Sequence, residues 1–138
     1  MYDYDISEKF FGLFQSYKDS IDKLNGVLLD YENLSKLSDT LEEEGFPKFQ
    51  LYLNSEISKA KVLFTLTSLN PSVVWLCGHG ELEEGENLFL MGNVTDLSNP
   101  ENIRDSAFSI AVHQNNCQRV LFVFDFCHSC TMINLKYY

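Results

Sequence analysis

The sequence predicts a single α/β domain in which a mainly parallel sheet is flanked by helices. Short apolar runs alternate with amphipathic stretches along the 138 residues, as in chains whose strands are joined by crossover helices. Two runs, at residues 72–77 and 121–126, are almost continuously apolar, which is typical of strands buried on both faces of a parallel sheet. Residues 1–8 are polar and acidic, so we expect a short tail followed by one domain over residues 9–138.

The first half of the domain is expected to contain two strands and a long helix. An aromatic run at residues 10–14 is assigned to the first strand. Apolar residues then recur every three or four positions over residues 24–41, which predicts an amphipathic helix, and Gly45 suits its C-terminal cap. Alternating apolar and polar residues over 49–53 predict a half-buried second strand.

The middle of the chain is expected to hold a second helix, a buried strand and a hairpin. Ser55 is suited to cap a helix that runs to about residue 69. The buried strand at residues 72–77 follows. Glutamates dominate residues 81–86, which predicts an exposed acidic turn, and residues 88–91 form the short hairpin strand after it.

The last part of the chain is expected to add a helix and the second buried strand. Asn99 and Pro100 have the pattern of a helix start, with proline at the first helical position. The buried face of that helix is predicted to comprise Ile103, Ala107, Ile110 and Ala111. The strand at residues 121–126 follows, and residues 131–138 are expected to begin another helix.

Composition and charge exclude several classes of function. The net charge is −10 and the pI about 4.6, which argues against nucleic acid or an anionic membrane as the main partner. No apolar run reaches the length of a membrane span, and the acidic start has no signal-peptide core, so we expect a cytoplasmic protein. There the four cysteines would be thiols or metal ligands rather than disulfides.

The two buried strands end in residues that carry chemistry. Strand 72–77 leads into Gly78, His79 and Gly80, and strand 121–126 leads into Cys127. Ligands collect at the carboxyl ends of parallel strands, so these side chains are expected to meet. A histidine can take the proton of a cysteine nucleophile, and the backbone N–H groups of Gly80 and Cys127 can hold an oxyanion.

At these residues the sequence resembles the caspase-like cysteine peptidases, and among them most closely the metacaspases. Residues 77–80, Cys-Gly-His-Gly, resemble the family's Ser-Gly-His-Gly. Residues 124–131, Phe-Asp-Phe-Cys-His-Ser-Cys-Thr, resemble its Phe-Asp-x-Cys-His-Ser-Gly-Thr, and residues 24–30 are similar to its Leu-x-Gly-Cys-x-x-Asp. The interval of 48 residues between His79 and Cys127 is close to the fifty or so found in caspases. The resemblance extends from about residue 10 to residue 138 and implies a three-layer caspase-like fold.

The resemblance implies a role for each of these residues. Cys127 would be the nucleophile and His79 the general base. Asp30 and Asp125 match the acidic pocket that selects arginine or lysine before the cleaved bond, and Cys77 takes the place of the pocket's serine. The implied reaction is hydrolysis of a protein or peptide substrate after a basic residue, because paired carboxylates match the donors of a guanidinium.

The sequence also departs from the family. Val27 replaces a pocket cysteine, Cys130 replaces the glycine after Cys-His-Ser, and Asn134 replaces an aspartate used for calcium, so we expect no cofactor and no calcium requirement. The family continues with a smaller segment that adds two strands, whereas 11 residues follow Cys127 here. We therefore expect a fold truncated after the nucleophile strand. Either a homodimer or a separate small-subunit chain completes it, or the protein is a remnant that cannot cleave efficiently.

Two alternatives compete with the peptidase hypothesis. Cys77, His79, Cys127 and Cys130 form a Cys₃His set that could bind zinc. A catalytically silent caspase-like module, acting as a binding partner or decoy, would also retain this sequence. The individual residues have simpler interpretations as well, since Asp125 could cap a following helix and Asp30 could be an ordinary solvated carboxylate.

Overall fold

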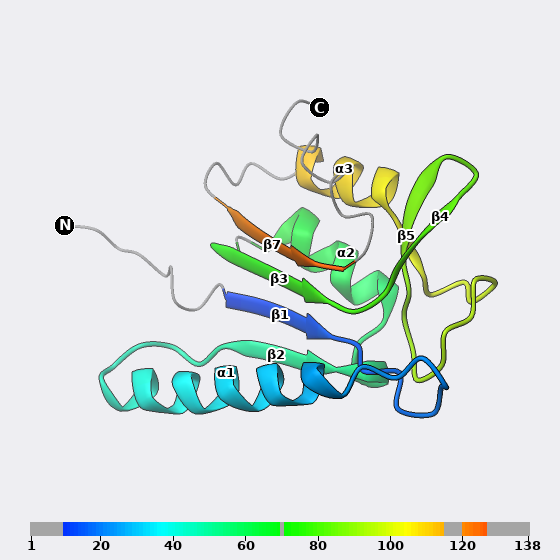
Figure 1. Cartoon of the computed structure of the whole chain (residues 1–138). Coiled ribbons are helices and arrows are strands. Elements are labelled where there is room, and N and C mark those ends of the chain that lie inside the picture. The colour runs from blue at the N-terminus through cyan, green and yellow to red at the C-terminus, as the bar shows by residue number, and fades with distance from the viewer. Residues whose placement is uncertain (1–9, 70, 115–119, 127–138) are drawn as a thin grey trace.

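In the part of the chain that the structure describes, the central sheet is parallel and has four strands (Figure 1). The computed structural model describes residues 10–69, 71–114 and 120–126. The strands lie in the order β2 (Gln50–Leu53), β1 (Phe10–Phe14), β3 (Val73–Cys77) and β7 (Leu121–Asp125). The prediction of an α/β fold with a mainly parallel sheet is confirmed in this part of the chain, and the four strands are present. The prediction that residues 121–126 are buried on both faces is wrong, because β7 is the last strand of the described sheet and its Leu121 is 62% exposed.

Helices cover both faces of this sheet. The 19-residue helix α1 (Asn25–Glu43) packs on one face, and α2 (Lys59–Ser68) and α3 (Asp105–Gln114) lie together on the other (Figure 1). Helix α1 ends where the sequence predicts, because Gly45 has a φ of 95° that its missing side chain permits. No helix in the described ranges is both long and apolar enough to span a membrane.

The starts of two helices were predicted wrongly. Helix α2 is capped by Ser58 rather than Ser55: the Ser58 hydroxyl accepts a hydrogen bond from the Lys61 N–H at 3.2 Å. Residues 54–56 instead form a 3₁₀ turn, and Ile57 is buried in the core before the helix begins. A buried apolar residue outside the helix therefore decides where the helix starts.

Helix α3 begins at Asp105, five residues after Pro100, which the sequence predicts as its first helical position. The intervening residues Ile103–Arg104 form strand β6, which pairs with β5 (Glu86–Phe89). The predicted buried face is wrong at Ile110, which is 58% exposed, whereas Phe108 is fully buried. Pairing with a neighbouring strand thus prevents the helix from starting at its local signal.

The hairpin is longer than the sequence indicated. Its first strand, β4 (Gly80–Glu83), overlaps the first half of the stretch predicted as an acidic turn. The turn itself is Glu84 and Gly85, whose φ angles of 54° and 82° are those of a two-residue hairpin loop. Glu83 and Glu86 are not merely solvated, because Arg104 contacts their carboxylates at 2.9 and 3.6 Å.

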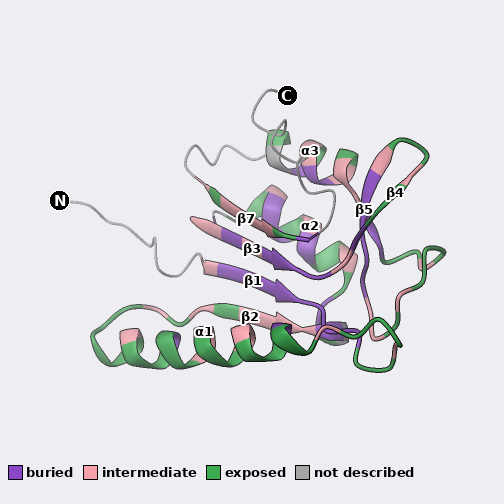
Figure 2. Ribbon diagram, viewed as in Figure 1, coloured by how far each residue is buried: buried purple, intermediate pink, exposed green. Residues whose placement is uncertain are grey.

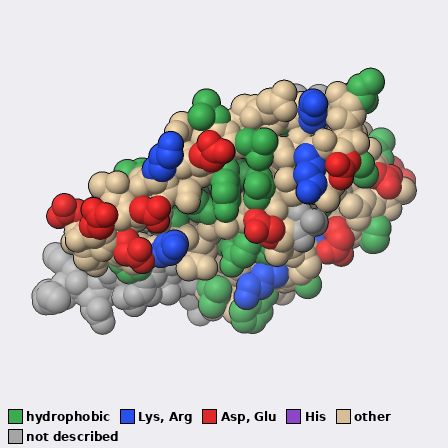
Figure 3. Space-filling view, turned by 90° about the horizontal axis from the view of Figure 1, so that it is seen from below, with side chains coloured by type: hydrophobic (Ala, Val, Ile, Leu, Met, Phe, Trp, Pro, Cys, Tyr) green, Lys and Arg blue, Asp and Glu red, His purple; other side chains and the backbone are tan. Residues whose placement is uncertain are grey.

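Two of the three apolar clusters in the described residues lie on opposite faces of the sheet, and the third joins Tyr17 to Leu88 and Leu90. The larger apolar cluster joins β1 and β3 to α2 and α3, and a smaller one joins Phe14 and Cys77 to Val27 of α1. Figure 2 shows the interior strands buried along much of their length and α1 largely exposed. Seen from below, hydrophobic side chains gather near the middle of the surface (Figure 3). The carboxyl ends of β3 and β7 lie beside the N-terminal part of α1.

Candidate active site

A cavity of about 620 Å³ opens at the carboxyl ends of β3 and β7, beside the N-terminus of α1. Cys77 and Asp125 face each other there as register partners of the two strands. The cavity is lined by Lys23, Leu24, Asn25, Gly26, Val27, Asp30, Cys77, Gly78, His79, Phe124, Asp125 and Phe126. This is the edge of the sheet at which the sequence predicts chemistry.

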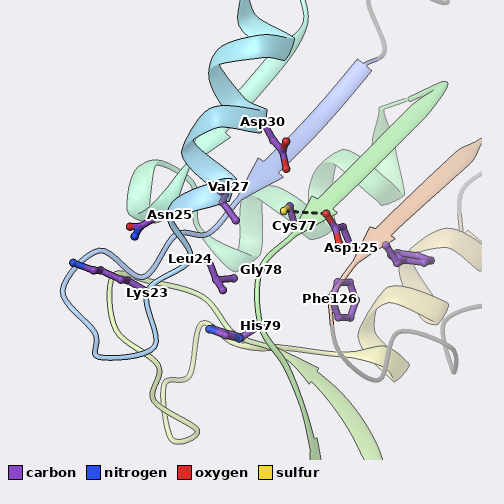
Figure 4. A pocket seen from close by; sticks show the side chains of 12 residues that line it. Lys23, Leu24, Asn25, Val27, Asp30, Cys77, Gly78, His79, Asp125 and Phe126 are labelled. Atoms are coloured by element: carbon purple, nitrogen blue, oxygen red, sulfur yellow. Dashed lines mark hydrogen bonds between the residues drawn. The ribbon is translucent and has the colours of Figure 1, made fainter.

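Three of the predicted site residues converge in this cavity. Asp30, Cys77 and Asp125 come from α1, β3 and β7, and their ligand atoms lie within 4.8 Å of one another. Figure 4 shows the three side chains pointing toward one another. Val27, one turn before Asp30, is buried in the cluster that holds Cys77 and so fixes the face of α1 that is turned to the strands. Residues separated by up to 95 positions in sequence thus form one polar group.

The Cys77 thiol is held in its neutral form. The side chain is 3% exposed, and its Sγ donates a hydrogen bond to Asp125 Oδ2 at 3.5 Å. Burial, followed by the nearby carboxylates of Asp125 and Asp30, raises the pKa of Cys77 to about 12. Cys77 is therefore a hydrogen-bond donor in this group and not a nucleophile.

Among the residues that the structure describes, Asp30, Cys77 and Asp125 form a group that could hold a metal ion. A metal would need Cys77 as a thiolate, whereas the surroundings of this thiol favour its protonated form. Two carboxylates and a neutral thiol suit an organic cation with several N–H donors better. Lys23 also lines the cavity, but its side chain points away from the three (Figure 4).

His79 lines the same cavity, and its imidazole is oriented by a backbone carbonyl. Nε2 lies 2.7 Å from the carbonyl oxygen of Asp22, and because a carbonyl only accepts, Nε2 carries the proton. In the neutral ring Nδ1 is then the proton acceptor. The geometry therefore selects the tautomer that a general base requires.

The segment that carries Asp22 is tied down on both sides. Leu24 N–H donates to the Ser16 carbonyl at 2.7 Å, and Asp19 N–H donates to the Asn93 carbonyl at 3.0 Å. The Thr95 hydroxyl donates to Asp22 Oδ2 at 3.1 Å. These hydrogen bonds restrain the connection between β1 and α1, and with it the Asp22 carbonyl that orients His79.

Gly78 is needed for the close approach of three segments. A Cβ atom at this position would lie 2.6 Å from the Tyr17 hydroxyl oxygen and 3.1 Å from Gln15 Cβ. The Gly78 N–H continues the ladder of β3 and β7 by donating to the Asp125 carbonyl at 3.2 Å. The glycine of the predicted motif therefore has a steric function next to the histidine.

The remaining predicted residues stand as follows. Gly80 is buried as the first residue of β4 and is not among the described residues that line the cavity. Cys127 and Cys130 lie outside the described residues, so the nucleophile, its oxyanion N–H and the Cys₃His alternative remain predictions. The helix predicted over residues 131–138 also lies outside them.

Sequence reasoning missed Asp22 and Tyr17. Asp22 acts through its backbone carbonyl, for which no residue type is diagnostic. Tyr17 lies three residues after the end of β1, is fully buried and contacts His79, with ring centroids 4.8 Å apart. Its only sequence signal is an aromatic residue among polar ones shortly after a strand.

A scan against models of known protein families finds no match, and a search of curated proteins finds no similar sequence. The resemblance to metacaspases therefore depends on the motifs quoted above.

Proposed function

We propose that the protein is a cysteine endopeptidase of the caspase-like type that cleaves peptide bonds after arginine or lysine. Cys127 is the nucleophile, His79 the general base, and Asp30, Cys77 and Asp125 bind the basic side chain. One observation carries the proposal. The three residues that the resemblance assigns to the basic pocket converge within 4.8 Å in one cavity, and His79 lines that cavity too.

The strand register supports the pairing of His79 with Cys127. Cys77 and Asp125 are register partners, His79 follows Cys77 by two residues, and Cys127 follows Asp125 by two. Chain connectivity limits the separation of the Asp125 and Cys127 Cα atoms to about 7 Å. His79 and Cys127 therefore follow register partners on adjacent strands by the same number of residues, which supports the proposed pairing.

In the proposed reaction the Cys127 thiol transfers its proton to His79 Nδ1, and the thiolate attacks the carbonyl carbon of the bond after the basic residue. The C–N bond breaks as the imidazolium returns that proton to the leaving amine. Water, deprotonated by His79, then hydrolyses the thioester and releases the acid. The Asp22 carbonyl accepts the hydrogen bond from Nε2 and so keeps the imidazole in one orientation throughout.

The pocket accounts for the basic preference. A guanidinium can donate to Asp30 and Asp125 together, and the neutral Cys77 thiol adds no charge between them. A neutral side chain of the same shape would leave both carboxylates without a cation. Specificity thus depends on charge more than on shape.

The test is covalent labelling with an electrophilic peptide that ends in arginine. The matched control probe carries citrulline, which keeps the shape and removes the charge. We expect wild-type protein to be labelled at Cys127, His79→Ala to be labelled about 100-fold more slowly or worse, and the citrulline probe to react poorly. Equal reaction of all four cysteines with both probes would contradict the proposal.

A binding module without turnover is the second candidate. The acidic group is formed by residues that precede Cys127, so binding a basic peptide does not itself require the nucleophile. Calorimetry with an arginine peptide and the Cys127→Ala variant measures that binding directly. Binding together with absent hydrolysis by the wild type would favour the module over the peptidase.

A further inference from the structure

The Tyr17 hydroxyl lies between two backbone segments at the histidine. It donates to the Leu90 carbonyl at 2.7 Å and accepts a hydrogen bond from the His79 N–H at 2.7 Å. Tyr17 itself has a φ of 53°, an uncommon conformation for an aromatic residue. A strained backbone and a fully buried ring thus hold this hydroxyl in place.

The register of the hairpin explains what the hydroxyl does. Gly80 pairs with Phe89 and Glu81 with Leu88, so the next pair is His79 with Leu90. Leu90 N–H donates directly to the His79 carbonyl at 3.0 Å, which is one of the two bonds of such a pair. The second bond, from His79 N–H to the Leu90 carbonyl, passes through the Tyr17 hydroxyl instead.

The hydroxyl therefore holds the ladder open on one side of His79. A direct N–H···O bond spans about 2.9 Å, whereas the relay needs two bonds of 2.7 Å with an oxygen between them. The Tyr17 ring also packs against the imidazole, and the missing side chain of Gly78 makes room for the hydroxyl. The hydrogen bond from the His79 N–H and the ring contact thus both join Tyr17 to His79, whose Nε2 donates to the Asp22 carbonyl.

We propose that Tyr17 is a positioning residue for His79: its hydroxyl, inserted between His79 and Leu90, places the imidazole against the Asp22 carbonyl. The inference rests on the proposed function for its consequence in catalysis, although the placement of the imidazole can be tested without any substrate. Burial raises the pKa of Tyr17 well above its usual value, so the hydroxyl keeps the proton that it donates to Leu90.

The kinetic test compares Tyr17→Phe with wild type. Without the hydroxyl the ladder can close, and the imidazole moves away from Asp22. We expect kcat on an arginine peptide to fall about 10- to 100-fold, with KM changed less than about threefold because the acidic pocket is intact. The control is Tyr52→Phe, which should leave kcat unchanged: the half-buried Tyr52 ring lies in β2, packs on Phe11 of β1 and does not line the cavity.

The structural test is nitrogen NMR of His79 in the same proteins. We expect wild type to show the neutral tautomer protonated at Nε2, and Tyr17→Phe to show a mixture of tautomers. Unchanged kcat and an unchanged tautomer in Tyr17→Phe would overturn the inference. If wild type shows no turnover but the tautomer changes in the variant, the proposed function fails and the positioning role stands.

A measurement on wild type alone covers the case in which Tyr17→Phe does not fold. A buried hydroxyl between two partners exchanges slowly, so its proton should give an NMR resonance with a nuclear Overhauser effect to the His79 amide. Absence of that effect in folded wild-type protein would overturn the inference.

Discussion

Alternate residues of strand β3 point to opposite faces of the sheet, and the two faces differ in what surrounds them. Val74 and Leu76 are fully buried and pack with α2 and α3 in the large apolar cluster. Trp75 and Cys77 face α1, where the cover is a single helix and the neighbours of Cys77 include two carboxylates. Stability is thus concentrated on one face, and the capacity to bind a cation on the other.

The comparison indicates that the Cys77 group is not kept for stability. Burying a polar group without an ideal partner costs free energy, and the thiol-to-carboxylate hydrogen bond is long at 3.5 Å. An apolar residue would pack at this position without that cost. A ligand that uses the two carboxylates supplies a reason for the arrangement.

The largest effect is expected on the apolar face. Leu76→Ala removes a fully buried side chain from the large cluster, so we expect the free energy of unfolding to fall by about 2–5 kcal/mol in urea titrations. Leu82→Ala is the matched control, because that leucine is 56% exposed on β4 and should change stability by less than about 0.5 kcal/mol. Equal losses in the two variants would mean that this face is not the main source of stability.

A smaller effect, on binding rather than stability, is expected on the other face. Asp30→Asn and Asp125→Asn each remove one charge from the cavity, so the affinity for an arginine peptide should fall about 10- to 100-fold. Unfolding should change by less than about 1 kcal/mol, because neither side chain is buried.

Asp39→Asn serves as the control for this prediction. It removes a charge from an exposed position on the same helix, outside the cavity. Calorimetry should give wild-type affinity for this variant. A comparable loss of affinity in Asp39→Asn would show that net charge, and not the cavity, attracts the peptide.

The same contrast decides what the sequence could predict. The strands of the sheet were predictable because their apolar side chains recur in short runs or alternate with polar ones, and Asp30, Cys77 and Asp125 were predictable because of a motif resemblance. The start of α3 at Asp105 was not, because the pairing of Ile103 with Phe89 depends on a distant segment. Asp22 could not be predicted either, since a backbone carbonyl leaves no trace in residue type.

The smallest effect is a pH dependence carried by Cys77. Its pKa is about 12 in the folded protein, against 9.0 for an ordinary thiol. Above pH 9 the unfolded chain loses this proton while the folded chain keeps it, so the stability contributed by the neutral thiol is full below pH 9 and declines as the pH rises toward 12. Between pH 8 and 10 the loss should be about 1 kcal/mol, since one pKa unit corresponds to about 1.4 kcal/mol.

The measurement is the free energy of unfolding in urea at pH 8, 9 and 10, for wild type and for Cys77→Ser. Other groups that titrate in this range are common to both proteins, so the difference between the two profiles isolates this thiol. Wild type should lose about 1 kcal/mol more than the variant over the range. Parallel profiles would show that neither burial nor the nearby carboxylates raise the pKa of Cys77, which would contradict the electrostatic contrast between the two faces of β3.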